Sequence, residues 1–221
     1  MSTLIFEQVL SGGDRNYGYI AGCQKTKLGV VIDPSPDPLP VYNRVKELGL
    51  NILFVINTHT HSDHTGGNAF FVKETGAVVI THEWNSTENS DWGKIRKVKD
   101  GETLNVGDMV FTFIHTPGHT KESMCIRIEN ELITGDTLFV GKVGGTYSGE
   151  NTSKEFESLK KLMELKPDIR IWPGHNYGVR PSSTIGEELR TNPFMLRLNN
   201  YENFMWLKDN WAAYKLEHGI A

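Results

Sequence analysis

The sequence predicts an α+β protein in which two β-sheets lie between outer layers of helices, a four-layer αββα sandwich. Short apolar strand-like runs alternate with helical patterns up to residue 81, and residues 102–135 then read as strands joined by short turns. A helix, one more short strand and a helical tail follow. At 221 residues the chain suits one domain with an appendage. We expect a core domain over residues 1–175 and a short C-terminal helical extension over residues 176–221 that packs near the functional site.

In the first half of the chain, apolar and turn-forming residues mark each element. Val41, Val45 and Leu48 fall at helical spacing after a proline-rich turn, and Gly49 is placed to end that helix. The strands expected in this half are 4–10, 17–23, 28–33, 51–57 and 77–81, and a second helix is expected near 65–75.

In the second half, strands come before helices. Thr152 and Glu155 form a capping-box pattern, which predicts the start of a helix over 152–165. A last short strand is expected over 169–175. The tail carries aromatic residues roughly along one helical face, which predicts packing rather than a cofactor site: Tyr201, Phe204, Trp211 and Tyr214.

Composition narrows the range of functions. A net charge of −4 and a pI near 6.1, with no long basic run, argue against nucleic acid as a partner. Residues 1–16 show neither a basic start nor a long apolar stretch, so we expect a cytoplasmic protein without a membrane partner. Cys23 and Cys125 lie in apolar strand-like segments, which predicts buried, reduced thiols. The oligomeric state is left open.

The strongest functional signal is a group of imidazoles directly after the most apolar strand. His59, His61, Asp63 and His64 fall within six residues that follow the apolar run 52–56. Residues two apart at an extended strand end point the same way, so His59 and His61 can chelate one ion. Asp63 and His64 come one turn later and can face a neighbouring ion. Imidazole and carboxylate suit zinc, iron or manganese, so the pattern predicts a metal site.

Three further candidate ligands follow other predicted strands. His119, Asp136 and His175 each come after an apolar strand and beside a glycine, which lets the backbone turn tightly close to the site. This recurrence at four strand ends predicts one shared metal centre. Asp33, which ends the strand 28–33, is a candidate for supporting that centre without binding metal.

These residues resemble the metallo-β-lactamase superfamily, whose H-x-H-x-D-H motif is matched by residues 59–64. The resemblance covers residues 4–175 and implies an αββα sandwich with its site at the rim between the sheets. It also implies two divalent ions, with Asp63 and Asp136 as catalytic carboxylates. The implied ligands of the first ion are His59, His61 and His119, those of the second are Asp63, His64 and His175, and Asp136 bridges the two.

Such a pair of ions predicts hydrolytic chemistry. Two divalent ions about 3.5–4 Å apart can hold a bridging hydroxide and polarise a carbonyl at the same time. Metal binding lowers the pKa of water to about 7, which gives a nucleophile at neutral pH. A thiol with a pKa near 8.5 can leave as thiolate without a strong general acid. Because the sequence shows no separate acid–base pair, we expect the hydroxide to attack the carbonyl of a small thioester.

Within the superfamily, the sequence is most similar to glyoxalase II, the hydroxyacylglutathione thioesterase. The segments 135–141 and 183–195 resemble its bridging-aspartate and C-terminal segments, respectively. The resemblance implies Tyr147 and Tyr177 as substrate-binding residues. Lys142 and Arg180 are further candidates, for binding an anionic part of the substrate. The family's glutathione-contacting lysine falls on Gly145 here, so the thiol carrier is left open, with glutathione as one candidate.

Two other activities use the same residues. Persulfide dioxygenases share this fold and carry one iron on two histidines and a carboxylate, which would be His59, His119 and Asp136. Lactonases use the whole ligand set. Secreted zinc β-lactamases usually carry cysteine where Asp136 stands, so hydrolysis of β-lactams is not expected.

Overall fold

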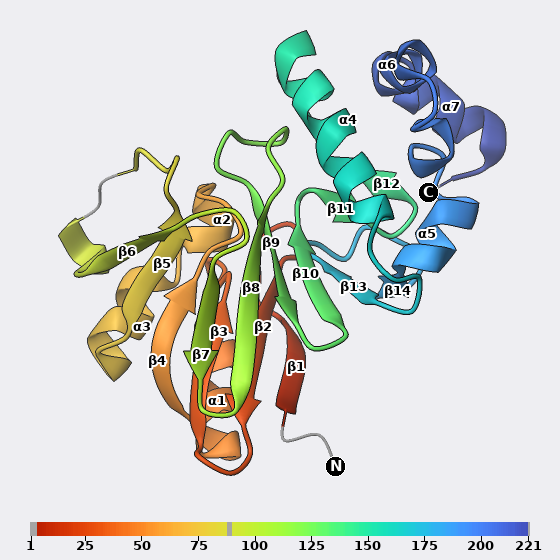
Figure 1. The fold of residues 1–221 in the computed structure, drawn as a ribbon. Coiled ribbons are helices and arrows are strands. Elements are labelled where there is room, and N and C mark those ends of the chain that lie inside the picture. The colour runs from red at the N-terminus through yellow and green to blue at the C-terminus, as the bar shows by residue number, and fades with distance from the viewer. Residues whose placement is uncertain (1–3, 88–89, 221) are drawn as a thin grey trace.

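The computed structural model of the chain describes residues 4–87 and 90–220 and confirms the αββα layering (Figure 1). The first half contains β1 (Leu4–Leu10), β2 (Tyr17–Cys23), β3 (Leu28–Ile32), α1 (Leu39–Leu48), β4 (Asn51–Ile56), α2 (Ser62–Thr65), α3 (Asn68–Thr75), β5 (Val78–His82) and β6 (Ile95–Val98). The second half contains β7 (Thr103–Val106), β8 (Met109–His115), β9 (Met124–Ile128), β10 (Glu131–Gly135), β11 (Leu138–Phe139), β12 (Lys142–Val143), α4 (Gly149–Met163) and β13 (Arg170–Pro173). The chain ends with β14 (Ser183–Thr184), α5 (Ile185–Thr191), α6 (Tyr201–Asp209) and α7 (Trp211–His218).

The strand directions decide where the loops meet. Within the described residues, the first sheet has the order β1–β2–β3–β4–β5–β6 and the second the order β14–β13–β10–β9–β8–β7. Strands β3 to β6 run parallel to one another, and β10 runs parallel to β13. The carboxyl ends of parallel neighbours lie at the same edge of a sheet. The loops after β3 and β4 therefore meet at one edge, and those after β10 and β13 meet at another.

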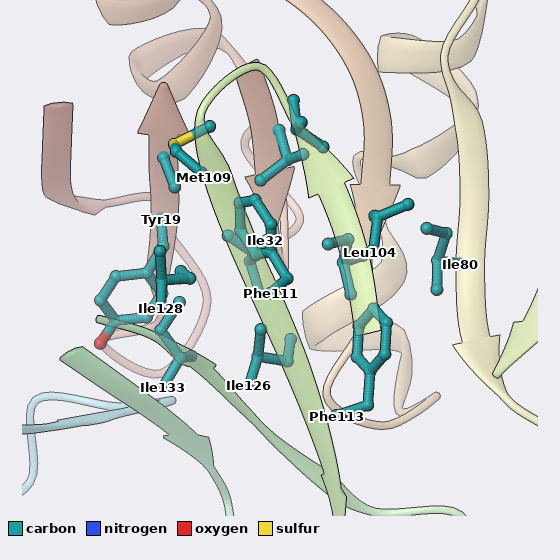
Figure 2. Close-up of a cluster of buried hydrophobic side chains, with 14 of the residues drawn as sticks. Tyr19, Ile32, Ile80, Leu104, Met109, Phe111, Phe113, Ile126, Ile128 and Ile133 are labelled. Carbon is teal, nitrogen blue, oxygen red and sulfur yellow. The ribbon is translucent and has the colours of Figure 1, made fainter. Parts of the chain in front are cut away.

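The two sheets enclose an apolar core (Figure 2). Tyr19 and Ile32 from the first sheet face Phe111, Phe113 and Ile126 from the second, and all five side chains are fully buried. Side chains alternate between the two faces of a strand, so each sheet contributes one apolar face to this layer. Burial of large side chains here provides the rigid base on which the strand-end loops are held.

Helices cover the outer faces of both sheets (Figure 1). Val45 of α1 and Phe71 of α3 pack on the first sheet, and Leu159 of α4 packs on the second. Phe204 of α6 is buried in the same cluster as Leu159, and Trp211 packs against it. The aromatic residues of the tail therefore serve packing, as expected.

The start of helix α4 differs from the expected capping box. The helix begins at Gly149, and the Ser148 side chain accepts a hydrogen bond from the Asn151 backbone N–H. Thr152 lies inside the helix and donates its hydroxyl to the Ser148 carbonyl, while Glu155 is buried. The capping-box prediction is wrong because an earlier serine satisfies the helix N-terminus, which leaves Glu155 available for a different contact.

Other elements differ only locally. The helix expected near 65–75 is divided into α2 and α3, and the tail is divided at Asn210 between α6 and α7. The edge strand β6 was not expected. Cys23 and Cys125 are buried and free, as predicted. In the described part of the chain, no helix is both long and apolar enough to cross a membrane.

Candidate metal centre

The predicted ligands converge where the strand-end loops of the two sheets meet. Strand β4 leads into the segment 59–64, the second half of which lies in the short helix α2. In the second sheet, Gly135 pairs with Pro173 across the parallel strands β10 and β13. Asp136 and His175 therefore follow neighbouring strand ends. Because β8 has the same direction as β10, the loop that follows β8 also reaches this edge.

The first group contains His59, His61 and His119. Their ring nitrogens face a common point: His59 Nε2 lies 3.1 Å from His61 Nδ1, and His119 Nε2 lies 3.0 Å from the same atom. Zinc–nitrogen bonds of about 2.0–2.1 Å in a tetrahedron place two nitrogens about 3.3 Å apart. The spacing of this group therefore fits one ion.

The second group contains Asp63, His64 and His175. His64 Nε2 lies 3.2 Å from His175 Nε2. The Asp63 Oδ2 atom lies 3.4 Å from the His175 nitrogen and 3.6 Å from the His64 nitrogen. All three ligand atoms fall within 4.8 Å of one another, as do those of the first group. A second divalent ion fits this set.

Asp136 lies between the two groups. Its Oδ2 is 3.5 Å from His119 Nε2 and 3.4 Å from His175 Nε2, while its Oδ1 is 3.4 Å from His64 Nε2. Oδ1 is buried without a hydrogen-bond partner among the described residues. Burial by itself would raise the pKa of this carboxyl, but the interactions with His64, His175 and His59 together outweigh it, and the pKa lies well below its usual value. A buried carboxylate with an unpaired oxygen indicates a metal ligand.

Asp33 supports the centre from outside. Its Oδ1 accepts a hydrogen bond from the Thr58 backbone N–H at 2.8 Å, and its Oδ2 accepts from the Thr58 hydroxyl at 2.6 Å. The same Oδ2 lies 3.0 Å from His64 Nδ1. These donors occupy both oxygens of the Asp33 carboxylate, so Asp33 fits the expected supporting role. The carboxylate fixes the His64 ring and leaves the His64 Nε2 atom directed into the site.

Backbone carbonyls hold two other imidazoles. The Gly145 carbonyl lies 2.8 Å from His119 Nδ1, and the Asp14 carbonyl lies 2.9 Å from His175 Nδ1. A carbonyl only accepts hydrogen bonds, so each Nδ1 carries the proton and each Nε2 is free to bind an ion. Sequence reasoning missed both contacts, because a backbone carbonyl has no residue-type signature.

Sequence reasoning also missed Asn16, in the loop between β1 and β2. Its Nδ2 donates to Asp63 Oδ2 at 3.0 Å and to the Asp63 carbonyl at 3.2 Å. Asn16 is fully buried, so it fixes the half-buried Asp63 in place. It lies 47 residues from its partner, and no local pattern marks it.

The candidate substrate residues Tyr177 and Lys142 lie beside the second group. The Tyr177 ring stacks on His175 with centroids 4.6 Å apart, and its hydroxyl donates to Asp14 at 2.6 Å. Lys142 Nζ lies 3.9 Å from the centre of the Tyr177 ring. Arg15, which the sequence did not single out, lies 4.7 Å from that ring. Two cations therefore flank this side of the centre.

Tyr147 and Arg180 occupy different surroundings. Tyr147 is 79% exposed, and its ring lies 6.4 Å from that of His119. Arg180 forms an ion pair with Glu187 at 3.1 Å and donates to Ser183, neither of which belongs to the centre. Tyr147 lies where it can contact a substrate bound at the first group. A substrate-binding role for Arg180 stays a prediction.

At Gly174 the backbone lies very close to the candidate ligands. A Cβ atom at this position would lie 2.4 Å from Asp136 Oδ1 and 2.7 Å from His64 Cε1. We expect Gly174→Ala to displace one of these ligands and to lower metal content per chain, measured by elemental analysis. Gly149→Ala is the control, because no atom lies within 4 Å of its added Cβ. Equal metal content in both variants would contradict the close approach.

An αββα sandwich with histidines and aspartates gathered at the strand ends of both sheets defines a class of metal-dependent proteins. Within that class, this chain belongs to the metallo-β-lactamase superfamily: residues 11–175 match the sequence profile of that superfamily.

Individual relatives agree with this assignment. Hydroxyacylglutathione hydrolase of Polaromonas sp. is 35% identical over 181 residues, which cover 79% of this chain and 67% of that protein. This chain thus spans about two thirds of that relative's length. The probable polyketide biosynthesis zinc-dependent hydrolase BaeB of Bacillus velezensis is 26% identical over 197 residues, covering 86% of this chain and 85% of BaeB. The similarity to glyoxalase II expected from the sequence is confirmed.

Among solved structures, ETHE1 from Myxococcus xanthus has a similar fold. It superposes with a TM-score of 0.84 at 30% sequence identity, covering 94% of this chain and 91% of that one. The similarity extends over nearly the whole chain.

Proposed function

We propose that this chain is a binuclear metal-dependent hydrolase of small thioesters. The observation that carries this proposal is the position of Asp136, whose two oxygens lie within 3.5 Å of nitrogens from both histidine groups. A carboxylate shared in this way fits two ions better than one. The names of the two relatives above support the reaction class, since both proteins are named as hydrolases.

Each part of the centre has a separate role in this proposal. Bound divalent ions would supply an activated water and would polarise the substrate carbonyl. The first group and the second group would each hold one ion, and Asp136 and Asp63 would provide the carboxylate charge. Asp33 and the Gly145 carbonyl keep the imidazole rings in the binding orientation. The apolar strands below exclude solvent from the base of the site.

We propose that the thioester lies across the mouth of this centre. A cavity of about 490 Å³ opens between the loop that carries Tyr147 and the helices α6 and α7. Lys142 and Lys208 also line it; Lys208 is paired with Glu155, so Lys142 is the lysine whose charge favours an anionic thiol carrier. Because one relative is named as a hydroxyacylglutathione hydrolase, glutathione is the first carrier to test.

The test is reconstitution of metal-free protein with zinc, iron or manganese, followed by a substrate panel. We expect two ions per chain and hydrolysis of thioesters, including hydroxyacylglutathione and acyl-coenzyme A. One iron per chain with persulfide-dependent oxygen uptake would instead establish the dioxygenase that His59, His119 and Asp136 could support. Hydrolysis of lactones without thioesters would establish a lactonase.

A further inference from the structure

A buried ion pair links the C-terminal extension to helix α4. Lys208 Nζ of α6 lies 2.5 Å from Glu155 Oε2 of α4, and these side chains are only 11% and 1% exposed. Burial raises the pKa of the Glu155 carboxyl to about 7, although Lys208 opposes that shift. Removing two charges from water has a large desolvation cost, so such a pair is weak evidence for stability alone. The other contacts of Lys208 and Glu155 indicate a further role for this pair.

The first of these contacts reaches the loop beside the first histidine group. Lys208 Nζ also donates to the Gly144 carbonyl at 2.5 Å. The next residue, Gly145, provides the carbonyl that accepts the His119 Nδ1 proton at 2.8 Å. Gly144 itself lies against the centre, because a Cβ there would be 3.3 Å from His119 Cβ and 1.9 Å from the Asp136 carbonyl oxygen. Two hydrogen bonds, joined by the Gly144–Gly145 backbone, thus link Lys208 to the His119 ring.

The second contact is between Glu155 and the backbone next to His119. Gly118, which precedes His119, packs so closely on α4 that a Cβ there would lie 2.4 Å from Glu155 Cβ. Glu155 therefore abuts the backbone before His119 and also holds Lys208, which fixes the loop that binds the His119 ring. The backbone and the ring of one candidate ligand are both supported by this buried pair.

We propose that Lys208 is a positioning residue for the metal centre, which fixes the backbone at Gly144 and Gly145 and so orients the His119 ring. This inference rests on the proposed function, because it takes His119 as a metal ligand. It also gives the extension, residues 176–221, a defined role, because helix α6 provides the cation that completes the support of a site whose ligands all precede it in the chain.

The test compares three variants of the full chain. The double variant Glu155→Gln/Lys208→Met removes the lysine without leaving a buried carboxylate unpaired. Glu155→Gln alone removes the charge pair but keeps the lysine donor for Gly144. Lys161→Met is the matched control, because Lys161 lies on α4 and, like Lys208, bonds a carboxylate, that of Asp100 at 2.7 Å, together with a backbone carbonyl.

Two measurements are made on each variant. Zinc affinity is determined by competition with a chelator, and we expect the double variant to bind the first ion about tenfold to 100-fold more weakly, as is typical when an outer contact of a ligand is lost. Long-range ¹H–¹⁵N spectra of metal-free protein report the Nδ1 proton of His119. We expect its signal to disappear in the double variant and to persist in Glu155→Gln and in the control.

The outcomes separate this inference from the proposed function. Wild-type zinc affinity and an intact His119 signal in the double variant would overturn the positioning role. A loss in Glu155→Gln as large as in the double variant would also overturn it, since the charge pair rather than the bond to Gly144 would then matter. If wild-type protein binds no metal, the proposed function fails, and the ring spectra alone decide whether Lys208 orients His119.

Discussion

Replacement of Asp136 by alanine is expected to lower bound metal below two ions per chain and to reduce thioester hydrolysis by more than about 100-fold. The reason is that one carboxylate approaches nitrogens of both groups, so its loss removes a ligand from each ion. Elemental analysis and steady-state kinetics on the same preparation measure both effects. Asp100→Ala, which removes a carboxylate paired with Lys161, is expected to change neither. Two tightly bound ions and full activity in Asp136→Ala would show that this residue does not bridge.

Replacement of Asp33 by alanine has the largest expected effect on stability. Three buried donors, the Thr58 N–H, the Thr58 hydroxyl and His64 Nδ1, would lose their acceptor at once. Each unsatisfied buried group costs about 1–3 kcal/mol, so we expect the free energy of unfolding of metal-free protein to fall by about 3 kcal/mol or more. Urea denaturation followed by circular dichroism measures this change.

Asp33→Asn and Asp108→Ala serve as comparisons. Asparagine keeps the shape and one acceptor oxygen, so its loss of stability is expected to be smaller than that of alanine. Asp108 pairs with Lys25 at the surface, where removal of an ion pair changes stability little. An Asp33→Ala protein with an unchanged urea midpoint would rule out this supporting role.

Most of the fold was predictable because its signals are local. The strand 4–10 and the helix ending at Gly49 were expected at nearly the observed positions, since a short apolar run and a glycine after a helical pattern are visible in a short window. The start of α4 was not, because Ser148 and Thr152 both suit an N-cap and no signal in a short window decides between them. The pairing order of distant strands was likewise not visible in any short window.

The candidate ligands could be predicted from local signals in the sequence, but the groups that orient them could not. Imidazoles and carboxylates reveal their chemistry in their residue type, and strand ends place them together. The groups that orient them include the carbonyls of Asp14 and Gly145, whose role depends on backbone position alone. Asn16 and Lys208 reach the centre from distant segments and have ordinary surroundings in the sequence.

Because ligands from both sheets meet at one centre, we expect metal supply to affect the stability of the folded protein. His64 and His175 face each other although 111 residues of chain separate them, so an ion held by both would join two distant segments. A ligand that binds the folded chain and not the unfolded one adds its binding free energy to stability. Metal supply would then control how long each molecule survives proteolysis, in addition to whether it is active.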